Sequence, residues 1–119
     1  MHLLGLRTLI YPSVELESDK KWWTELLGYE PYFDKPFYVG FDVGGYELGL
    51  DPNAKTGDGP RVYFGVDSVE QAVKEFVKQE CTIHEAVSEV GDGIIVATVK
   101  RPNGQLVGLI YNPHFKTKH

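Results

Sequence analysis

Cysteine is nearly absent from this sequence, and long runs of one charge sign or of apolar residues are absent too. Cys81 is the only cysteine in 119 residues, so no intrachain disulfide can form and packing must hold the fold. The apolar start of the chain, residues 1–6, stops at Arg7, too soon for a signal peptide or a membrane span. Lysine and arginine form no cluster and the formal net charge is -5, which argues against nucleic acid as a partner. We therefore expect a cytoplasmic protein with neither a membrane nor a nucleic-acid partner.

The residues that are present fit an ordinary globular protein. Hydrophobic residues make up 42% of the chain and charged residues 24%, and the length suffices for one buried core. We expect residues 1–119 to form a single domain.

Both halves of the chain predict the same order of elements, a strand, a helix and three more strands. In the first half we expect a strand at Leu3–Val14, a helix capped by Ser18 and stopped by Gly28, and strands at Glu30–Phe33, Phe37–Val43 and Tyr46–Leu50. In the second half we expect a strand at Arg61–Val66, a helix capped by Ser68 with apolar positions from Val69 to Val77, and strands at Thr82–Val90, Gly93–Lys100 and Gln105–Tyr111. Module one then spans about 3–53, the linker 54–60 and module two about 61–113.

The last strands of the two halves share a nine-residue frame. Gly45–Asn53 aligns with Gly104–Asn112, and four of the nine positions are identical. Alternation along a strand places Leu48 and Leu50 toward the helix, and Glu47, Gly49 and Asp51 on the opposite face. Gly108 takes the place of Gly49 in the second half, so each strand has room at the centre of the face away from its helix.

Three segments in this order resemble the vicinal oxygen chelate superfamily, which includes glyoxalases, bleomycin-resistance proteins and extradiol dioxygenases. They are Glu17–Pro31, with its Trp22-Trp23 pair before Leu27-Gly28, then Val66–Ala72, and finally Arg101–Leu109. The resemblance implies an α+β fold in which two tandem βαβββ modules form a curved mixed-sheet cleft. It also implies a homodimer.

The resemblance further implies four metal-ligand positions, which in this sequence are Thr8, Gly49, Arg61 and Gly108. None of them is His, Glu or Asp, the residue types that hold a catalytic divalent metal in such sites. We therefore expect neither a metal nor another cofactor. A displaced metal site that uses Glu47, Asp51 or His84 is the alternative.

The leading hypothesis is a metal-independent binding protein for a small, partly apolar or anionic ligand in the inter-module cleft. The residues expected to line that cleft are Thr8, Ile10, Glu47, Gly49, Arg61, Tyr63, Leu106 and Gly108. Arg61 either clamps a ligand anion or pairs with Asp58 or Glu47.

Two other classes of function stay open. One is a lyase, an isomerase or a dioxygenase-like enzyme that uses a displaced metal, or Glu47 or Asp51 as an acid or base. The other is a regulatory ligand-sensing module.

Overall fold

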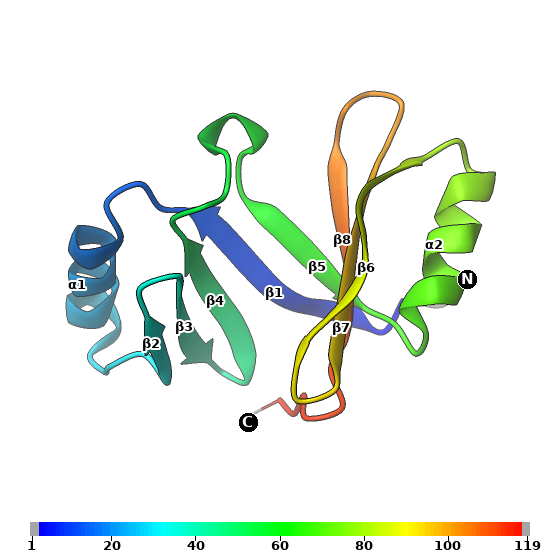
Figure 1. Ribbon diagram of the computed structural model, residues 1–119. Coiled ribbons are helices and arrows are strands. Elements are labelled where there is room, and N and C mark those ends of the chain that lie inside the picture. Colours follow the sequence, from blue (N-terminus) through cyan, green and yellow to red (C-terminus); the bar gives the residue numbers. More distant parts are fainter. Residues whose placement is uncertain (1–2, 118–119) are drawn as a thin grey trace. The chain divides into compact units, whose positions relative to one another are not determined.

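A strand, a helix and three strands follow one another twice in the computed structural model, which describes residues 3–117 (Figure 1). The first set is β1 (Gly5–Pro12), α1 (Leu16–Leu27), β2 (Phe33–Lys35), β3 (Tyr38–Val43) and β4 (Tyr46–Asp51). A short 3₁₀ helix, η1 (Thr56–Asp58), follows β4. The second set is β5 (Arg61–Gly65), α2 (Val69–Lys78), β6 (Thr82–Gly91), β7 (Ile94–Lys100) and β8 (Leu106–Tyr111). The predicted α+β fold of two βαβββ modules is confirmed, and the module boundaries stay a prediction.

The chain forms two compact units. We call Thr8–Arg61, together with residues 116–117, the α1 unit, and residues 3–7 with Val62–Phe115 the α2 unit. Strand β1 therefore begins in the α2 unit and continues in the α1 unit.

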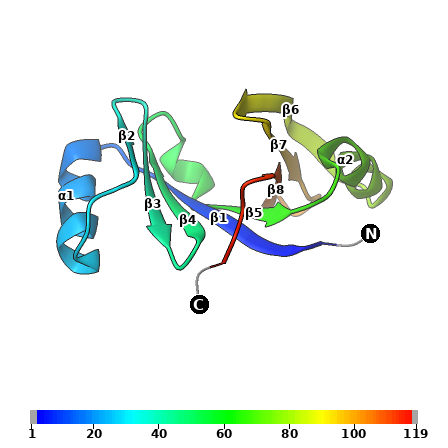
Figure 2. The ribbon, with the colours of Figure 1, turned by 90° about the horizontal axis from the view of Figure 1, so that it is seen from below.

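In the α1 unit, four strands pair in the order β2-β3-β4-β1, with β1 and β4 parallel and the other pairs antiparallel. Helix α1 lies along one face of this sheet (Figures 1 and 2). Val39, Phe41, Leu48 and Leu50 are buried there, and Tyr11, Leu16, Trp23 and Leu27 pack against them. One face of β3 and β4 is thus covered by the helix, as the alternation of their residues predicts.

In the α2 unit, four strands pair in the order β5-β8-β7-β6, with β5 and β8 parallel and the other pairs antiparallel. Its core joins Val69, Ala72 and Val73 of α2 to Ala97, Val99 and Leu109 of the sheet. We call the opposite face of each sheet its helix-free face.

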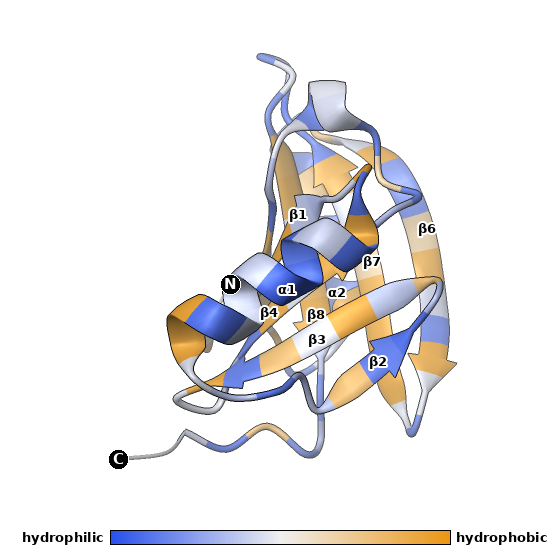
Figure 3. Ribbon diagram, turned by 90° about the vertical axis from the view of Figure 1, so that its left-hand side faces the viewer, coloured by the Kyte–Doolittle hydropathy of each residue, from blue (hydrophilic) through white to orange (hydrophobic). Residues whose placement is uncertain are grey.

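The hydropathy of the residues in β3 and α1 also differs between the side that faces the core and the side that faces away from it. Figure 3 shows apolar and polar residues alternating along β3, while hydrophilic residues cover much of α1. Helix α1 buries no residue completely, so it covers the sheet with a narrow apolar stripe.

The ends of the helices were partly predictable. Gly28 adopts a left-handed conformation with φ of 85° and stops α1, and the Ser68 hydroxyl accepts the backbone N–H of Gln71 at 3.2 Å to cap α2. The Ser18 cap was wrong, because α1 begins at Leu16, whose side chain packs on the core, and no side chain caps it.

The strand predicted at Glu30–Phe33 was also displaced. Strand β2 lies at Phe33–Lys35 because Lys35 pairs with Tyr38 across a two-residue turn, Pro36-Phe37.

Within residues 3–117, no helix has both the length and the apolar character needed to span a membrane.

Candidate functional site

Four of the predicted ligand-binding residues lie together on the helix-free face of the α1 unit. Thr8 is paired with Glu47, and Ile10 with Gly49, in the parallel register of β1 and β4. Paired residues of neighbouring strands point to the same side of a sheet, so these four positions form one patch. Leu48 and Leu50 lie on the other side, in the core.

Glu47 is the polar centre of this patch. The Tyr32 hydroxyl donates a hydrogen bond to one oxygen of its carboxylate, and the Tyr38 hydroxyl donates to the other. Tyr32 comes from the segment before β2 and Tyr38 begins β3, so three segments of the α1 unit meet at one carboxylate. The two donors fix the orientation of Glu47 toward the helix-free face.

Glycines make room for both tyrosine rings. The Tyr38 hydroxyl occupies the place that a Cβ atom at position 49 would take, and the Tyr32 ring lies 3.2 Å from the corresponding place at Gly40. In the α2 unit, the Tyr63 ring lies 2.6 Å from the Cβ place of Gly108. The space that the repeat predicts at Gly49 and Gly108 is therefore filled by tyrosines of neighbouring strands.

The tyrosine rings also bear on the four positions at which the family resemblance implies metal ligands. Gly49 and Gly108 have no donor atom, and aromatic side chains occupy the space into which a longer residue would extend. Arg61 is cationic and Thr8 offers one neutral hydroxyl. The four residues do not fit a divalent cation. Among the residues that the structure describes, no three His, Cys, Asp or Glu side chains come together either.

The polar contact at Glu47 also changes the acidity of its partner. Burial of the Tyr32 hydroxyl, its hydrogen bond to Glu47 and the nearby charges of Glu47 and Asp42 all raise the pKa of Tyr32 above its usual value. The hydroxyl therefore stays protonated and continues to donate throughout the neutral pH range.

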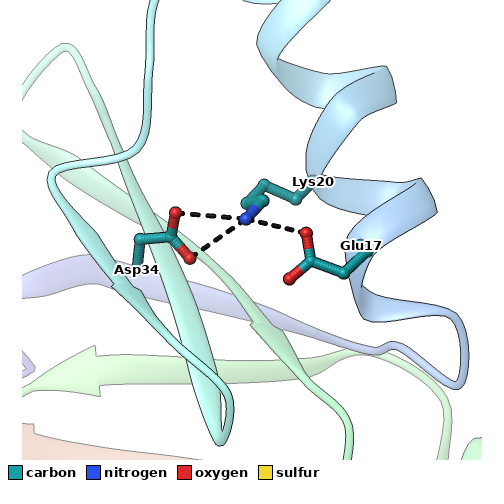
Figure 4. A network of polar contacts seen from close by, with 3 residues as sticks. All are labelled: Glu17, Lys20 and Asp34. Carbon is teal, nitrogen blue, oxygen red and sulfur yellow. Dashed lines mark hydrogen bonds and ion pairs between the residues drawn. The ribbon is translucent and has the colours of Figure 1, made fainter.

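The segment that contains Tyr32 is held to α1 by an ion-pair network. The Lys20 ammonium lies 2.9 Å from Glu17 and 3.1 Å from Asp34 of β2 (Figure 4). The hydrogen bonds that the Lys20 ammonium donates to Glu17 and Asp34 raise the pKa of Lys20. The backbone N–H of Tyr32 donates to the Gly40 carbonyl of β3 at 3.0 Å, which fixes the backbone of Tyr32 beside β3.

Asp51 stabilises the turn after β4. Its carboxylate accepts the backbone N–H of Asn53 at 2.8 Å, and its backbone carbonyl accepts the N–H of Ser13 at 3.0 Å. Asp51 lies four positions after Glu47 in an extended strand, which is about 13 Å at the usual rise. The two carboxylates do not form a directly interacting acid–base pair.

Arg61 lies 3.9 Å from the carboxylate of Asp58. The pairing with Asp58 is one of the alternatives that the sequence left open, and the clamp on a ligand anion stays a prediction.

The other predicted residues belong to the α2 unit. Tyr63 is paired with Gly108 across β5 and β8, and Leu106 lies on the same side of β8 as Gly108. The two units thus present separate groups of predicted residues, and the inter-module cleft stays a prediction.

Sequence reasoning missed three residues that shape these faces. Tyr32 and Tyr38 hold Glu47, and the Arg7 guanidinium lies over the Phe115 ring, 3.9 Å from its centroid, and against Gly65. The glycines at 40, 49 and 65 were the available signal, because a glycine inside a strand often marks the close approach of another group.

Comparison with known proteins identifies the fold. No protein-family profile and no curated protein sequence matches the chain. A glyoxalase/bleomycin resistance protein/dioxygenase superfamily member from Vibrio splendidus 12B01 is similar in structure, with a TM-score of 0.65 and 19% identity over 89% of this chain and 97% of its own. A methylmalonyl-CoA epimerase variant from Streptomyces coelicolor, in complex with 2-nitronate-propionyl-CoA, has a TM-score of 0.72 and 12% identity over 98% of this chain and 99% of its own.

A Mn(II)-bound glyoxalase from Novosphingobium aromaticivorans has a TM-score of 0.70 and 14% identity over 98% of this chain and 42% of its own. At these identities the similarity establishes the fold alone. The chain has the vicinal oxygen chelate fold shared by glyoxalases and bleomycin-resistance proteins, as the resemblance of its sequence predicted.

Proposed function

We propose that this chain is a metal-independent binding protein for a small, partly apolar molecule, and that the ligand lies on the helix-free face of the α1 unit. The observation that carries the proposal is the pair of tyrosine hydroxyls on Glu47, one of which fills the place of a side chain at Gly49. At Gly49 the family resemblance implies a metal ligand. This chain instead has tyrosine side chains and an oriented carboxylate around that position.

The composition of this surface supports a small organic ligand. Ile10 and the rings of Tyr32 and Tyr38 offer apolar area, while Thr8 and the carboxylate of Glu47 offer polar groups near its centre. Sites for small molecules usually combine apolar lining with a few oriented polar groups. The methylmalonyl-CoA epimerase with a similar fold is in complex with 2-nitronate-propionyl-CoA, which agrees with this use of the fold.

Metal content and ligand binding test the proposal together. The purified protein is analysed for Zn, Ni, Mn and Fe, and fragments that bind are sought by protein-observed NMR before and after dialysis against EDTA. We expect metal well below one equivalent, and fragments that shift backbone amides of β1, β3 and β4 equally before and after EDTA. Glu47→Gln should weaken that binding, whereas Glu85→Gln, which alters a carboxylate of the α2 unit, should leave it unchanged.

A metal present at one equivalent and removed together with binding by EDTA contradicts metal independence. Fragments whose shifts avoid β1, β3 and β4 contradict the location of the site.

A further inference from the structure

We infer that the Glu47 site recognises an ammonium group on its ligand, a primary or secondary amine that is protonated at neutral pH and attached to an apolar body. This inference rests on the proposed function, since it names the chemical class of the molecule that binds there.

Within residues 3–117, no basic side chain forms an ion pair with the Glu47 carboxylate. Its hydrogen-bond partners, Tyr32 and Tyr38, are neutral. Arg61, which the sequence offered as a partner, pairs with Asp58. A carboxylate without a counter-charge attracts a cation and repels an anion.

Neighbouring charges strengthen this preference. Asp42 is paired with Glu47 in the register of β3 and β4, so a second acidic residue lies on the same face. Within β2, β3 and β4 the one basic residue is Lys35, and it is paired with Tyr38 rather than with Glu47. The ligand group that best complements Glu47 is therefore positively charged.

Hydrogen-bond capacity remains on the carboxylate for such a group. Each oxygen of an ionised carboxylate has two lone-pair directions, and one on each oxygen is used by Tyr32 or Tyr38. An ammonium group donates up to three hydrogen bonds, so it can reach the remaining positions without displacing either tyrosine. Bonds of this charged kind are stronger than those between neutral groups.

Aromatic rings beside Glu47 suit both parts of the ligand. The ring centroids of Phe33 and Tyr38 are 6.1 Å apart, and those of Phe33 and Phe37 are 6.0 Å apart. Tyr32 is 62% exposed and Phe37 is 59% exposed, so part of this aromatic surface is accessible. The face of an aromatic ring attracts a cation, and its apolar area accommodates an apolar body.

Three probes of similar shape and different charge test the inference. Benzylamine is cationic at pH 7, benzyl alcohol is neutral and benzoate is anionic, and each is titrated into the isotopically labelled protein while the backbone amide shifts are followed. We expect benzylamine to shift the amides of Gly40, Glu47 and Gly49 and to bind at least about tenfold more tightly than either other probe. Glu47→Gln should weaken benzylamine binding by about the same factor. Glu85→Gln, which removes the carboxylate that accepts the Thr98 hydroxyl in the α2 unit, should leave it unchanged.

The outcomes separate the two proposals. Stronger binding of benzyl alcohol or benzoate at the same amides overturns the ammonium inference and leaves the ligand site of the proposed function in place. A lack of shift at these amides with all three probes overturns both. If Glu47→Gln fails to fold, ionic strength replaces it as the test in the wild-type protein. Added NaCl should weaken benzylamine binding and not benzyl alcohol binding, and equal effects on the two contradict the inference.

Discussion

Single residues on the helix-free faces determine which atoms are available to a ligand. Gly49 is the clearest case, because its missing side chain admits the hydroxyl of Tyr38, and that hydroxyl in turn orients Glu47. A residue without a side chain thus positions a charged one from a neighbouring strand.

Substitution of alanine for Gly49 and for Gly108 should lower the free energy of unfolding by different amounts. At Gly108 a new Cβ meets the backbone oxygen of Val62 at 2.7 Å, so Gly108→Ala should lower the free energy of unfolding by about 1 to 3 kcal/mol. At Gly49 the three atoms nearest to the Cβ all belong to the Tyr38 side chain, which can turn away. Gly49→Ala should therefore cost less, about 1 kcal/mol for the lost hydrogen bond to Glu47. Urea unfolding measures both.

Gly57→Ala is the control for this comparison, since a Cβ there meets open space. It should leave stability unchanged or slightly increase it by restricting the unfolded chain. A larger loss for Gly49→Ala than for Gly108→Ala contradicts the assignment of the backbone clash.

The Tyr32 hydroxyl should ionise at a higher pH than an ordinary tyrosine, because its pKa is raised. Its pKa is raised in the folded protein, so it favours folding below its unfolded value of about 10, and this contribution is lost as the pH rises through the folded-state pKa. Tyr32→Phe should then leave the 295 nm titration through about pH 10 unchanged. Glu47→Gln removes the negative charge of the carboxylate and should lower the pKa of Tyr32, which adds a tyrosine signal nearer pH 10.

Glu85→Gln serves as the matched variant and should not alter that titration. If Tyr32→Phe removes signal near pH 10, the hydroxyl ionises normally and its contact with Glu47 is not formed in solution.

At the scale of elements, the two helices begin in different ways. Helix α2 has a serine cap, in which Ser68 accepts the N–H of Gln71, while α1 begins at Leu16 without a side-chain cap. In α1, Glu17 and Asp19 in the first turn favour the start through their charge.

Removing the hydroxyl of each candidate cap separates these cases. Ser68→Ala should lower the free energy of unfolding by about 1 kcal/mol, because the N–H of Gln71 loses its acceptor. Ser18→Ala should have no such cost, since Ser18 lies inside α1 where alanine is the better helix former. Equal losses in thermal unfolding of the two variants argue against the observed start of α1.

The predictability of the elements has a physical limit. Alternation assigned Glu47 and Gly49 to one face and Leu48 and Leu50 to the other, because burial of one face is a property of a single strand. It could not identify Tyr32 and Tyr38 as partners of Glu47. They lie 15 and 9 residues away in sequence, and their approach depends on the registers of β2, β3 and β4.

Ser18 shows the same limit for a helix. A capping residue type was recognisable, but the packing of Leu16 on the core extended α1 past it. Local signals lose to tertiary contacts at such points.

At the scale of the whole molecule, the homodimer implied by the resemblance stays a proposal, and α1 offers a surface for it. Trp22 is 57% exposed and Leu26, one turn later, is 62% exposed, while Trp23 packs on the core. Large aromatic and aliphatic residues at this spacing form one apolar stripe on the outside of the helix.

Light scattering after size exclusion checks this proposal. We expect a mass of twice 13.4 kDa, and a shift toward the monomer in Trp22→Ser combined with Leu26→Ser. Ile83→Ser, a change at an equally exposed residue of β6, should leave the dimer intact. A wild-type monomer contradicts the dimer, and dissociation by Ile83→Ser alone moves the interface to β6.

Residues 3–7 belong with the second half of the chain. Leu4 donates its backbone N–H to Gly65 at 2.8 Å, and Arg7 lies over Phe115, so residues 3–7 complete the α2 unit although they precede α1 in sequence. A cut at 54–60, where the sequence predicts a linker, would leave this segment on the opposite fragment. The copies of the sequence repeat and the compact units are therefore out of phase, and separating the two copies would remove residues 3–7 from the α2 unit.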